Sequence, residues 1–154
     1  MIRPLRPEER AEWEALWQGY QRFYKVVIAP EITDLTWARL MDPDEPVHGL
    51  GAFADESGTE KLIGIVHYVF HRSTWMAGDT CYLQDLFVVP ESRGKRVGRA
   101  LIEAVYAEAD KRHVGQVYWL THNRNVAGRR LYDRLAANAG FILYERFAEV
   151  DPGC

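Results

Sequence analysis

Three consecutive segments with the pattern of β-strands, between residues 49 and 90, limit most strongly what this chain can fold into. They are GLGAFAD (Gly49–Asp55), KLIGIVHYVFH (Lys61–His71) and TCYLQDLFVVP (Thr80–Pro90), and each is rich in apolar, β-branched or aromatic residues. The turn-rich ESGTE and the loop RSTWMAGD separate them, and connections this short favour antiparallel neighbours. The middle of the chain therefore predicts an antiparallel sheet.

Helical periodicity is found on both sides of this sheet. After a short strand around Ile2 to Leu5, aromatic and apolar residues recur on one helical face from Trp13 to Tyr24. The other elements expected are a helix over Thr33–Met41 capped by Thr33 or Asp34, a helix from Val97 to about Arg112, a strand at Gln116–Thr121 buried on both faces, a helix over Val126–Asn138 and a last strand, FILYERFAEV, at Phe141–Val150. The order predicts one α/β domain over residues 1–154, with a mixed, mostly antiparallel central sheet flanked by helices and a right-handed strand–helix–strand crossover.

Charge and hydropathy exclude several functions. The formal net charge of −3 argues against bulk nucleic-acid binding, because phosphate tracking needs a strongly basic surface. The N-terminus MIRPLRPEER carries charge where a signal peptide needs an apolar segment, and no run reaches the ~18 apolar residues of a membrane helix. We expect a cytoplasmic protein with no nucleic-acid or membrane partner, and a homodimer as the candidate assembly.

Cysteine and histidine usage predicts neither a disulfide framework nor a metal site. Cys81 falls inside a strand pattern and Cys154 at the chain end, so both are expected to be reduced. His67 and His71 can share a strand face, but they would lie roughly 13 Å apart at ~3.3 Å per residue, too far to hold one metal ion.

A glycine-containing basic segment, VPESRGKRVGRALI (Val89–Ile102), connects the third predicted strand to the next helix. A helix N-terminus offers unpaired N–H groups and the positive end of the helix dipole, and glycines let a bulky anion come close. The segment lacks the Lys-Ser/Thr ending of a nucleotide P-loop and the complete G-x-G-x-x-G of a dinucleotide site. These features alone leave open either a bound phosphate or a solvated, arginine-rich helix start.

The longer stretch YLQDLFVVPESRGKRVGRALI resembles the acyl-CoA signature of the GNAT superfamily of N-acyltransferases. The signature is Arg or Gln, two residues, Gly, one residue, then Gly or Ala. Arg93 and Gly98 match its ends, and Arg96 stands where the family usually has its middle Gly. Downstream, NVAGRRLYDRL (Asn125–Leu135) is similar to the family's Asn-x-x-Ala-x-x-Leu-Tyr, with Gly128 at the usual Ala. Two motifs in the right order imply a GNAT-like fold and acetyl-CoA as cosubstrate.

The resemblance also implies a set of residues that bind acetyl-CoA. The backbone of the strand end would meet the pantetheine arm, the basic segment would surround the pyrophosphate, and Asn125 would contact the arm further along. The expected cofactor-binding residues are Leu86, Phe87, Val88, Arg93, Gly94, Lys95, Arg96, Val97, Gly98, Arg99, Asn125 and Gly128.

A narrower resemblance concerns HYVFHRSTWMAGDTCYLQDLFV, which is similar to the corresponding part of spermidine/spermine and diamine acetyltransferases. Those enzymes carry Tyr-Leu-Glu-Asp before the cofactor strand, and this chain has Gln84 in place of that Glu. The resemblance implies a small diamine, polyamine or lysine-like substrate, with Trp75, Gln84 and Tyr24 as candidate contacts. Trp75 could equally cap a hairpin, and for Tyr20, Phe23 and Tyr24 core packing is the preferred interpretation over a role in lining the amine pocket.

Two residues are candidates for proton transfer. An alkylammonium with a pKa near 10.4 must lose a proton before it attacks a thioester, and Asp85 is a candidate acceptor beside the expected thioester, with water or a structural ion pair as the alternatives. The resemblance assigns protonation of the leaving thiolate to Tyr132, which is seven residues after Asn125 and so on one helical face with it. We expect direct transfer from acetyl-CoA to a primary amine. The alternatives are a protein, peptide or aminoglycoside-like amine, or an acyl-CoA-binding module without catalysis.

Overall fold

The computed structural model describes residues 1–148, and the chain divides into two compact units, of which the first is Met1–Leu120 and the second begins at Thr121. The prediction of one acetyltransferase domain over the whole chain stays a prediction. Among the described residues, no helix combines the length and the apolar character needed to cross a bilayer.

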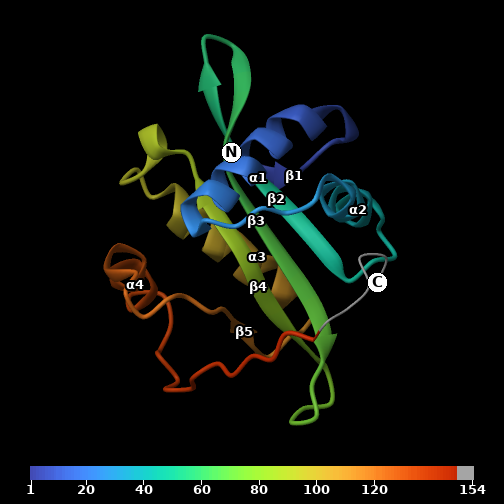
Figure 1. Ribbon diagram of the computed structural model, residues 1–154, viewed down its shortest axis with the longest axis vertical. Helices are drawn as coiled ribbons and strands as arrows, with labels where there is room; N and C mark the ends of the chain where they lie inside the picture. Colours follow the sequence, from blue (N-terminus) through green and yellow to red (C-terminus); the bar gives the residue numbers. More distant parts are fainter. Residues whose placement is uncertain (149–154) are drawn as a thin grey trace. The chain divides into compact units, whose positions relative to one another are not determined.

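The first unit is built on a mixed five-stranded sheet in the order β1-β2-β3-β4-β5 (Figure 1). The strands are β1 (Ile2–Pro4), β2 (Val47–Glu56), β3 (Thr59–Arg72), β4 (Asp79–Val88) and β5 (Val117–Tyr118). The first four pair antiparallel, whereas β5 runs parallel to β4. This confirms the predicted α/β class, the mostly antiparallel sheet and the three central strands.

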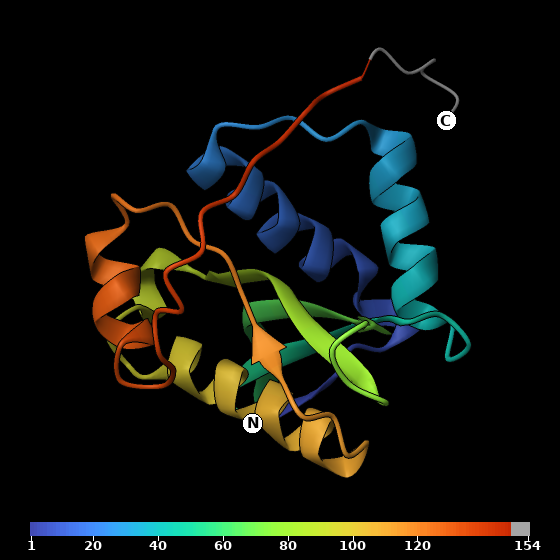
Figure 2. The same cartoon turned by 90° about the horizontal axis from the view of Figure 1, so that it is seen from below.

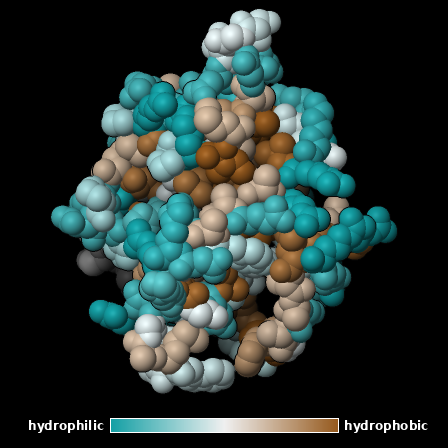
Figure 3. Space-filling view, turned by 180° about the vertical axis from the view of Figure 1, so that it is seen from behind, coloured by the Kyte–Doolittle hydropathy of each residue, from teal (hydrophilic) through white to brown (hydrophobic). Residues whose placement is uncertain are grey.

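Helices cover both faces of this sheet, with α1 (Arg10–Tyr24) and α2 (Pro30–Met41) on one face and α3 (Val97–Lys111) on the other (Figure 2). Two short 3-10 helices, η1 (Pro7–Glu9) and η2 (Pro90–Ser92), precede α1 and α3. The outer side of α3 carries charged residues such as Arg99 and Glu103, and the view from behind shows many hydrophilic side chains (Figure 3). The inner side packs Leu101, Ile102 and Val105, all fully buried, against the sheet.

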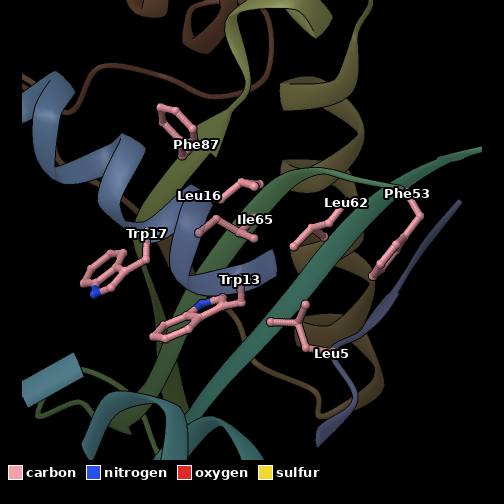
Figure 4. Close-up of a cluster of buried hydrophobic side chains, with 8 residues drawn as sticks. All are labelled: Leu5, Trp13, Leu16, Trp17, Phe53, Leu62, Ile65 and Phe87. Atoms are coloured by element: carbon pink, nitrogen blue, oxygen red, sulfur yellow. The ribbon is translucent and has the colours of Figure 1, made fainter. Parts of the chain in front are cut away.

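Aromatic and aliphatic side chains from α1 and the sheet form the core on the α1 face (Figure 4). Its members are Leu5, Trp13, Leu16, Trp17, Phe53, Leu62, Ile65 and Phe87. At about 25 cal/mol per Å² of apolar area, burial of such side chains is the main term that holds α1 on the sheet. Phe87 also packs so closely on Gly19 that a Cβ there would come within 2.7 Å of its ring.

The ends of several elements differ from the prediction. The helix α2 begins at Pro30 and not at Thr33 or Asp34, because proline at the first helical turn needs no intrahelical N–H partner. The strand β4 ends at Val88, since Pro90 has no N–H to continue the ladder and starts η2 instead. Predicted as Gln116–Thr121 and buried on both faces, β5 comprises only Val117 and Tyr118, both partly exposed.

The second unit departs most from the prediction. Its helix α4 covers Val126–Tyr132 and not Val126–Asn138, since the next turns are closed by i→i−3 bonds such as Leu135 N–H to the Tyr132 carbonyl. The last predicted strand is wrong for residues 141–148, which have no strand structure, and its final two residues lie outside the described ones. The apolar side chains of this segment, among them Phe141 and Tyr144, are 82% and 86% exposed, so the strand-like pattern is not matched by burial.

Candidate active site

The basic segment forms a tight turn that leads into α3. Gly94 has φ +77° and Arg96 has φ +63°, so two left-handed residues reverse the chain just before the helix. Arg96 is the N-cap of α3 and its side chain makes no capping bond, and the first helical turn contains no acidic residue. Apart from its chain neighbours, no atom of the described residues lies within 4 Å of the position that a Cβ on Gly94 would take. The turn therefore presents the positive end of α3 beside open space, which fits a diphosphate.

The basic side chains of this segment are not equivalent. The Arg93 Nε donates to the Val88 carbonyl at 3.0 Å, and its guanidinium lies over the rings of Phe23 and Phe87. Arg99 pairs with Glu103 one turn along α3. Within residues 1–148, Arg93, Lys95 and Arg96 have no ion-pair partner. Lys95 and Arg96 also make no side-chain hydrogen bond there, unlike Arg93, so these two are the cations most available to an anion. The predicted contacts Val97 and Gly98 form the first turn of α3.

One edge of β4 is open beyond its first residues. Within the described chain, β5 pairs with β4 only at Cys81 and Tyr82, whereas β3 pairs with β4 as far as Val88. The backbone groups of Leu86 and Val88 thus have a sheet neighbour on the β3 side only. A pantetheine arm carries amide groups that can bind such an edge, as the resemblance implies for Leu86, Phe87 and Val88. The side chain of Phe87 is part of the core and its backbone is paired with Ile65 of β3, so its role toward acetyl-CoA stays a prediction.

A β-bulge at Gln84 aims Asp85 at the α1 face of the sheet. His67 is opposite Asp85 and the next residue, Tyr68, is opposite Leu83, so Gln84 is the extra residue in β4. In a regular strand, Leu83 and Asp85 would share one face. With the bulge, Leu83 is buried opposite Tyr68, whereas Asp85 lies opposite His67, which contacts Trp13 on the α1 face. Gln84 itself is exposed.

Asp85 accepts a hydrogen bond inside a nearly closed environment. Its Oδ2 lies 3.0 Å from His67 Nδ1, and the two side chains are 13% and 3% exposed. Tyr20 on α1 also lies near the Asp85 carboxylate, whose negative charge acts on its hydroxyl. Burial, and then the negative charge of Asp85, raise the pKa of Tyr20, Tyr24 and Tyr82 above the usual tyrosine value. All three hydroxyls are therefore protonated at neutral pH and can donate to this carboxylate or to a substrate.

Aromatic rings also lie around this carboxylate. Tyr20 and Tyr24 have ring centroids 4.7 Å apart, and Tyr82 stacks on Tyr118 at 5.0 Å. A carboxylate beside several ring faces suits an ammonium group, which gains both an ion pair and cation–π contacts. The structure brings the predicted residues Asp85 and Tyr24 together here. It does not bring Trp75 to any described ring: this side chain is 87% exposed in the loop between β3 and β4.

The remaining predicted residues belong to the second unit. Asn125 is the N-cap of α4: its Oδ1 accepts from the Gly128 N–H at 3.1 Å, and its Nδ2 donates to Thr121 Oγ1 at 3.0 Å. A Cβ on Gly128 would collide with the Asn125 side chain, so glycine at this position permits the cap. Tyr132 is the last residue of α4. The roles of Asn125, Gly128 and Tyr132 toward acetyl-CoA stay predictions.

Sequence reasoning missed the residues that surround Asp85 from other elements. From the sequence, His67 stands out only as a possible metal ligand, and Trp13 and Tyr82 stand out only as a helix residue and a strand residue. One signal for them is present in the sequence: His67 lies inside an apolar strand, and a polar side chain that is buried there needs a hydrogen-bond partner. Among the described residues, no group of three or more His, Cys, Asp or Glu side chains lies close enough to hold a metal ion.

The chain belongs to the acetyltransferase (GNAT) family, whose sequence profile matches residues 11–137. It is thus an acetyl-CoA-dependent N-acetyltransferase. It is 37% identical over 146 residues to the D-amino-acid N-acetyltransferase HPA3 of Saccharomyces cerevisiae, covering 95% of this chain and 89% of the relative.

Two solved structures share the fold. A probable acetyltransferase superposes with a TM-score of 0.83 at 19% identity, covering 98% of this chain and 99% of its own. AAC(6')-Iy, an aminoglycoside N-acetyltransferase bound to a bisubstrate analogue of CoA, superposes with a TM-score of 0.81 at 16% identity, covering 96% and 97%. The narrower resemblance to polyamine acetyltransferases gains no specific support from these relatives.

Proposed function

We propose that this N-acetyltransferase transfers the acetyl group of acetyl-CoA to the primary amine of a small amino acid, and that Asp85 receives or directs the proton of that amine. The observation that carries the proposal is the carboxylate of Asp85, 13% exposed, surrounded by tyrosine hydroxyls and rings and three residues before the end of β4. The substrate class is supported by the relative that acetylates D-amino acids and is 37% identical over almost the whole chain.

The reaction needs the amine to be neutral when it attacks. The ammonium form has no lone pair, so one proton passes to Asp85 or to a water that Asp85 holds. The amine nitrogen then forms a bond to the thioester carbonyl carbon, and the carbon–sulfur bond breaks as the tetrahedral intermediate collapses. The nitrogen loses its second proton to water during this collapse. The thiolate takes one proton, which we assign to the Tyr132 hydroxyl, and the phenolate left there regains a proton from solvent. The products are the N-acetylated amine and the CoA thiol, with no covalent intermediate on the protein.

Recognition of the substrate follows from the same groups. The ammonium of an amino acid can approach Asp85 with Tyr20, Tyr24 and Tyr82 as neighbours, two of them from α1 and one from β4. The cosubstrate would be held by the open edge of β4 and by Lys95 and Arg96 at the start of α3. A diamine or lysine-like amine also fits an ammonium site, and it is the first competitor of an amino acid.

An amine panel tests the substrate class. Thiol release from acetyl-CoA is measured with D- and L-alanine, D- and L-lysine, putrescine and an aminoglycoside, and the acetylated nitrogen is located by mass spectrometry. We expect the highest kcat/KM for an amino acid, the D-enantiomer above the L-enantiomer, and acetylation at the α-amine. Turnover of putrescine alone, or of lysine only at its side-chain amine, would contradict the amino-acid assignment and favour a diamine-like substrate.

A further inference from the structure

A hydrogen-bonded chain of three side chains leads from the core to Asp85. The indole N–H of Trp13 on α1 donates to His67 Nε2 at 2.9 Å, and His67 Nδ1 lies 3.0 Å from Asp85 Oδ2. Trp13 is fully buried and His67 is 3% exposed. The three residues come from three different elements, α1, β3 and β4, and only Asp85 reaches toward solvent.

The indole at one end of the chain sets the tautomer of the histidine. An indole N–H can only donate, so Nε2 of His67 must accept and carries no proton. The proton of a neutral imidazole is then on Nδ1, which faces the Asp85 carboxylate and donates to it. The chain of donors thus runs in one direction, from Trp13 through His67 to Asp85.

Packing prevents the imidazole from turning away. The Trp17 and imidazole rings meet edge to face at a centroid distance of 5.1 Å, and the Trp13 ring lies at 5.9 Å. On the β2 side, a Cβ on Gly49 would lie 3.5 Å from His67 Cδ2, so the backbone of that strand is also close. The Oδ2 atom of Asp85 therefore faces a donor, His67 Nδ1, whose ring is packed on several sides.

We propose that His67, oriented by Trp13, is a positioning residue that binds Oδ2 of Asp85 and so leaves Oδ1 as the oxygen that receives the proton of the substrate amine. This role rests on the proposed function of Asp85. His67 acts through the carboxylate and touches neither substrate. The other titratable groups that face Asp85 are Tyr20 and Tyr24 from α1 and Tyr82 from β4. None of these tyrosines lies on the neighbouring strand β3 directly opposite Asp85, as His67 does.

Kinetics of two histidine variants test this role, with acetyl-CoA and D-alanine as probes. The amide nitrogen of asparagine is as many bonds from Cα as Nδ1 of histidine, so His67→Asn can still donate to Asp85, whereas His67→Leu cannot. We expect His67→Leu to lower kcat about tenfold or more with KM for acetyl-CoA within about twofold, since misplacing one catalytic group is that costly. His67→Asn should recover part of the loss. Equal losses in both variants would reduce His67 to a packing residue.

Two tryptophan variants provide a matched pair. Both indoles are in the same core and stack on each other, but among residues 1–148 the Trp17 Nε1 has no hydrogen-bond partner. Trp13→Phe thus removes a ring and a hydrogen bond, and Trp17→Phe removes only a ring. We expect kcat to fall at least about threefold further in Trp13→Phe than in Trp17→Phe when both are folded by circular dichroism. Equal kcat values in the two variants would contradict the chain.

A measurement without substrate separates this proposal from the proposed function. Nitrogen-15 NMR of labelled histidine reports which ring nitrogen carries the proton. We expect the Nδ1–H tautomer for His67 in the wild type and a mixture of tautomers in Trp13→Phe. The Nε2–H tautomer in the wild type would overturn the proposal even if amino acids are acetylated. If the wild type shows the Nδ1–H tautomer but acetylates no amino acid, the proposed function is wrong while the hydrogen-bonded chain stands.

Discussion

Asp85 comes just before the end of β4 in the sequence, and the turn from Arg93 to Arg96 comes just after it. Their charges are in opposite environments, the first mostly buried and the second exposed. The Asp85 carboxylate is 13% exposed and lies 3.0 Å from Nδ1 of the buried His67. The cations Lys95 and Arg96 are exposed and, within the described chain, unpaired. A buried charge needs a specific set of donors, because desolvation is costly, whereas exposed charges act on an anion through a field that salt screens. Substitutions at Asp85 should therefore cause large losses of activity. Substitutions at Lys95 and Arg96 should weaken acetyl-CoA binding by degrees.

The largest effect is expected at the buried carboxylate. Asp85→Asn keeps the size of the side chain but removes the base, so kcat should fall by about 10²- to 10⁴-fold, the usual range for loss of a general base. Steady-state kinetics with the best amino acid of the panel measures this change. The affinity for acetyl-CoA, measured by calorimetry, serves as the control and should stay within about twofold. A near-normal kcat would return Asp85 to a structural role and leave water as the acceptor.

The second largest effect on kcat is expected at Tyr132, the last residue of α4. Tyr132→Phe keeps the ring and removes the hydroxyl, so kcat should fall by roughly 10²-fold if this hydroxyl protonates the leaving thiolate. Acetyl-CoA should bind as before. An acyl donor with a less basic thiol leaving group should be much less sensitive to the substitution, because it needs the proton less. Equal sensitivity for both donors would leave Tyr132 without this role.

A smaller effect is expected at the exposed cations. The double variant Lys95→Glu with Arg96→Glu should weaken acetyl-CoA binding by at least about tenfold, or about 1.4 kcal/mol, and reduce the dependence of affinity on salt. Lys111→Glu at the other end of α3, where Lys111 pairs with Glu108, is the control, since it reverses a charge on the same helix far from its N-terminus. We avoid Arg93 in this test because it also holds the Val88 carbonyl. Equal affinities in the double variant and the control would rule out a diphosphate at this turn.

The smallest expected effect concerns the backbone of the same turn. Gly94→Ala places a Cβ in open space but at φ +77°, so it should lower the free energy of unfolding by about 1–2 kcal/mol through backbone strain alone. Gly78→Ala is the control, because that glycine also has open space around it and no left-handed φ. Urea denaturation of both variants measures the difference. If Gly94→Ala is no less stable than Gly78→Ala, the turn adapts more easily than its dihedral angles suggest.

The sequence predicted well those features that depend on local order. The helical periods of α1 and α3 are strong, because each helix has one face in the core. The strands β2, β3 and β4 were visible as apolar runs, because helices cover both faces of the sheet, and the bounds of all five elements are confirmed to within a few residues. The basic turn was visible because its glycines and cations are neighbours in the chain. Prediction failed from Tyr132 onward, where helix and strand patterns continue but residues 141–148 are largely exposed. Periodicity indicates what a segment can bury, and only packing decides whether it is buried.

Local patterns in the sequence by themselves determined the α/β class, the antiparallel middle of the sheet, the basic turn before α3 and Asp85 as a candidate. Only the tertiary structure decided what surrounds Asp85. The bulge at Gln84 depends on how β3 and β4 pair, and it sets which face of the sheet the carboxylate occupies. Trp13 and His67 are 54 residues apart, and His67 and Asp85 are 18 apart, so no local pattern links them. Their hydrogen bonds exist because α1 packs on the sheet and excludes water from that face, and a buried imidazole must then find its partners within the protein.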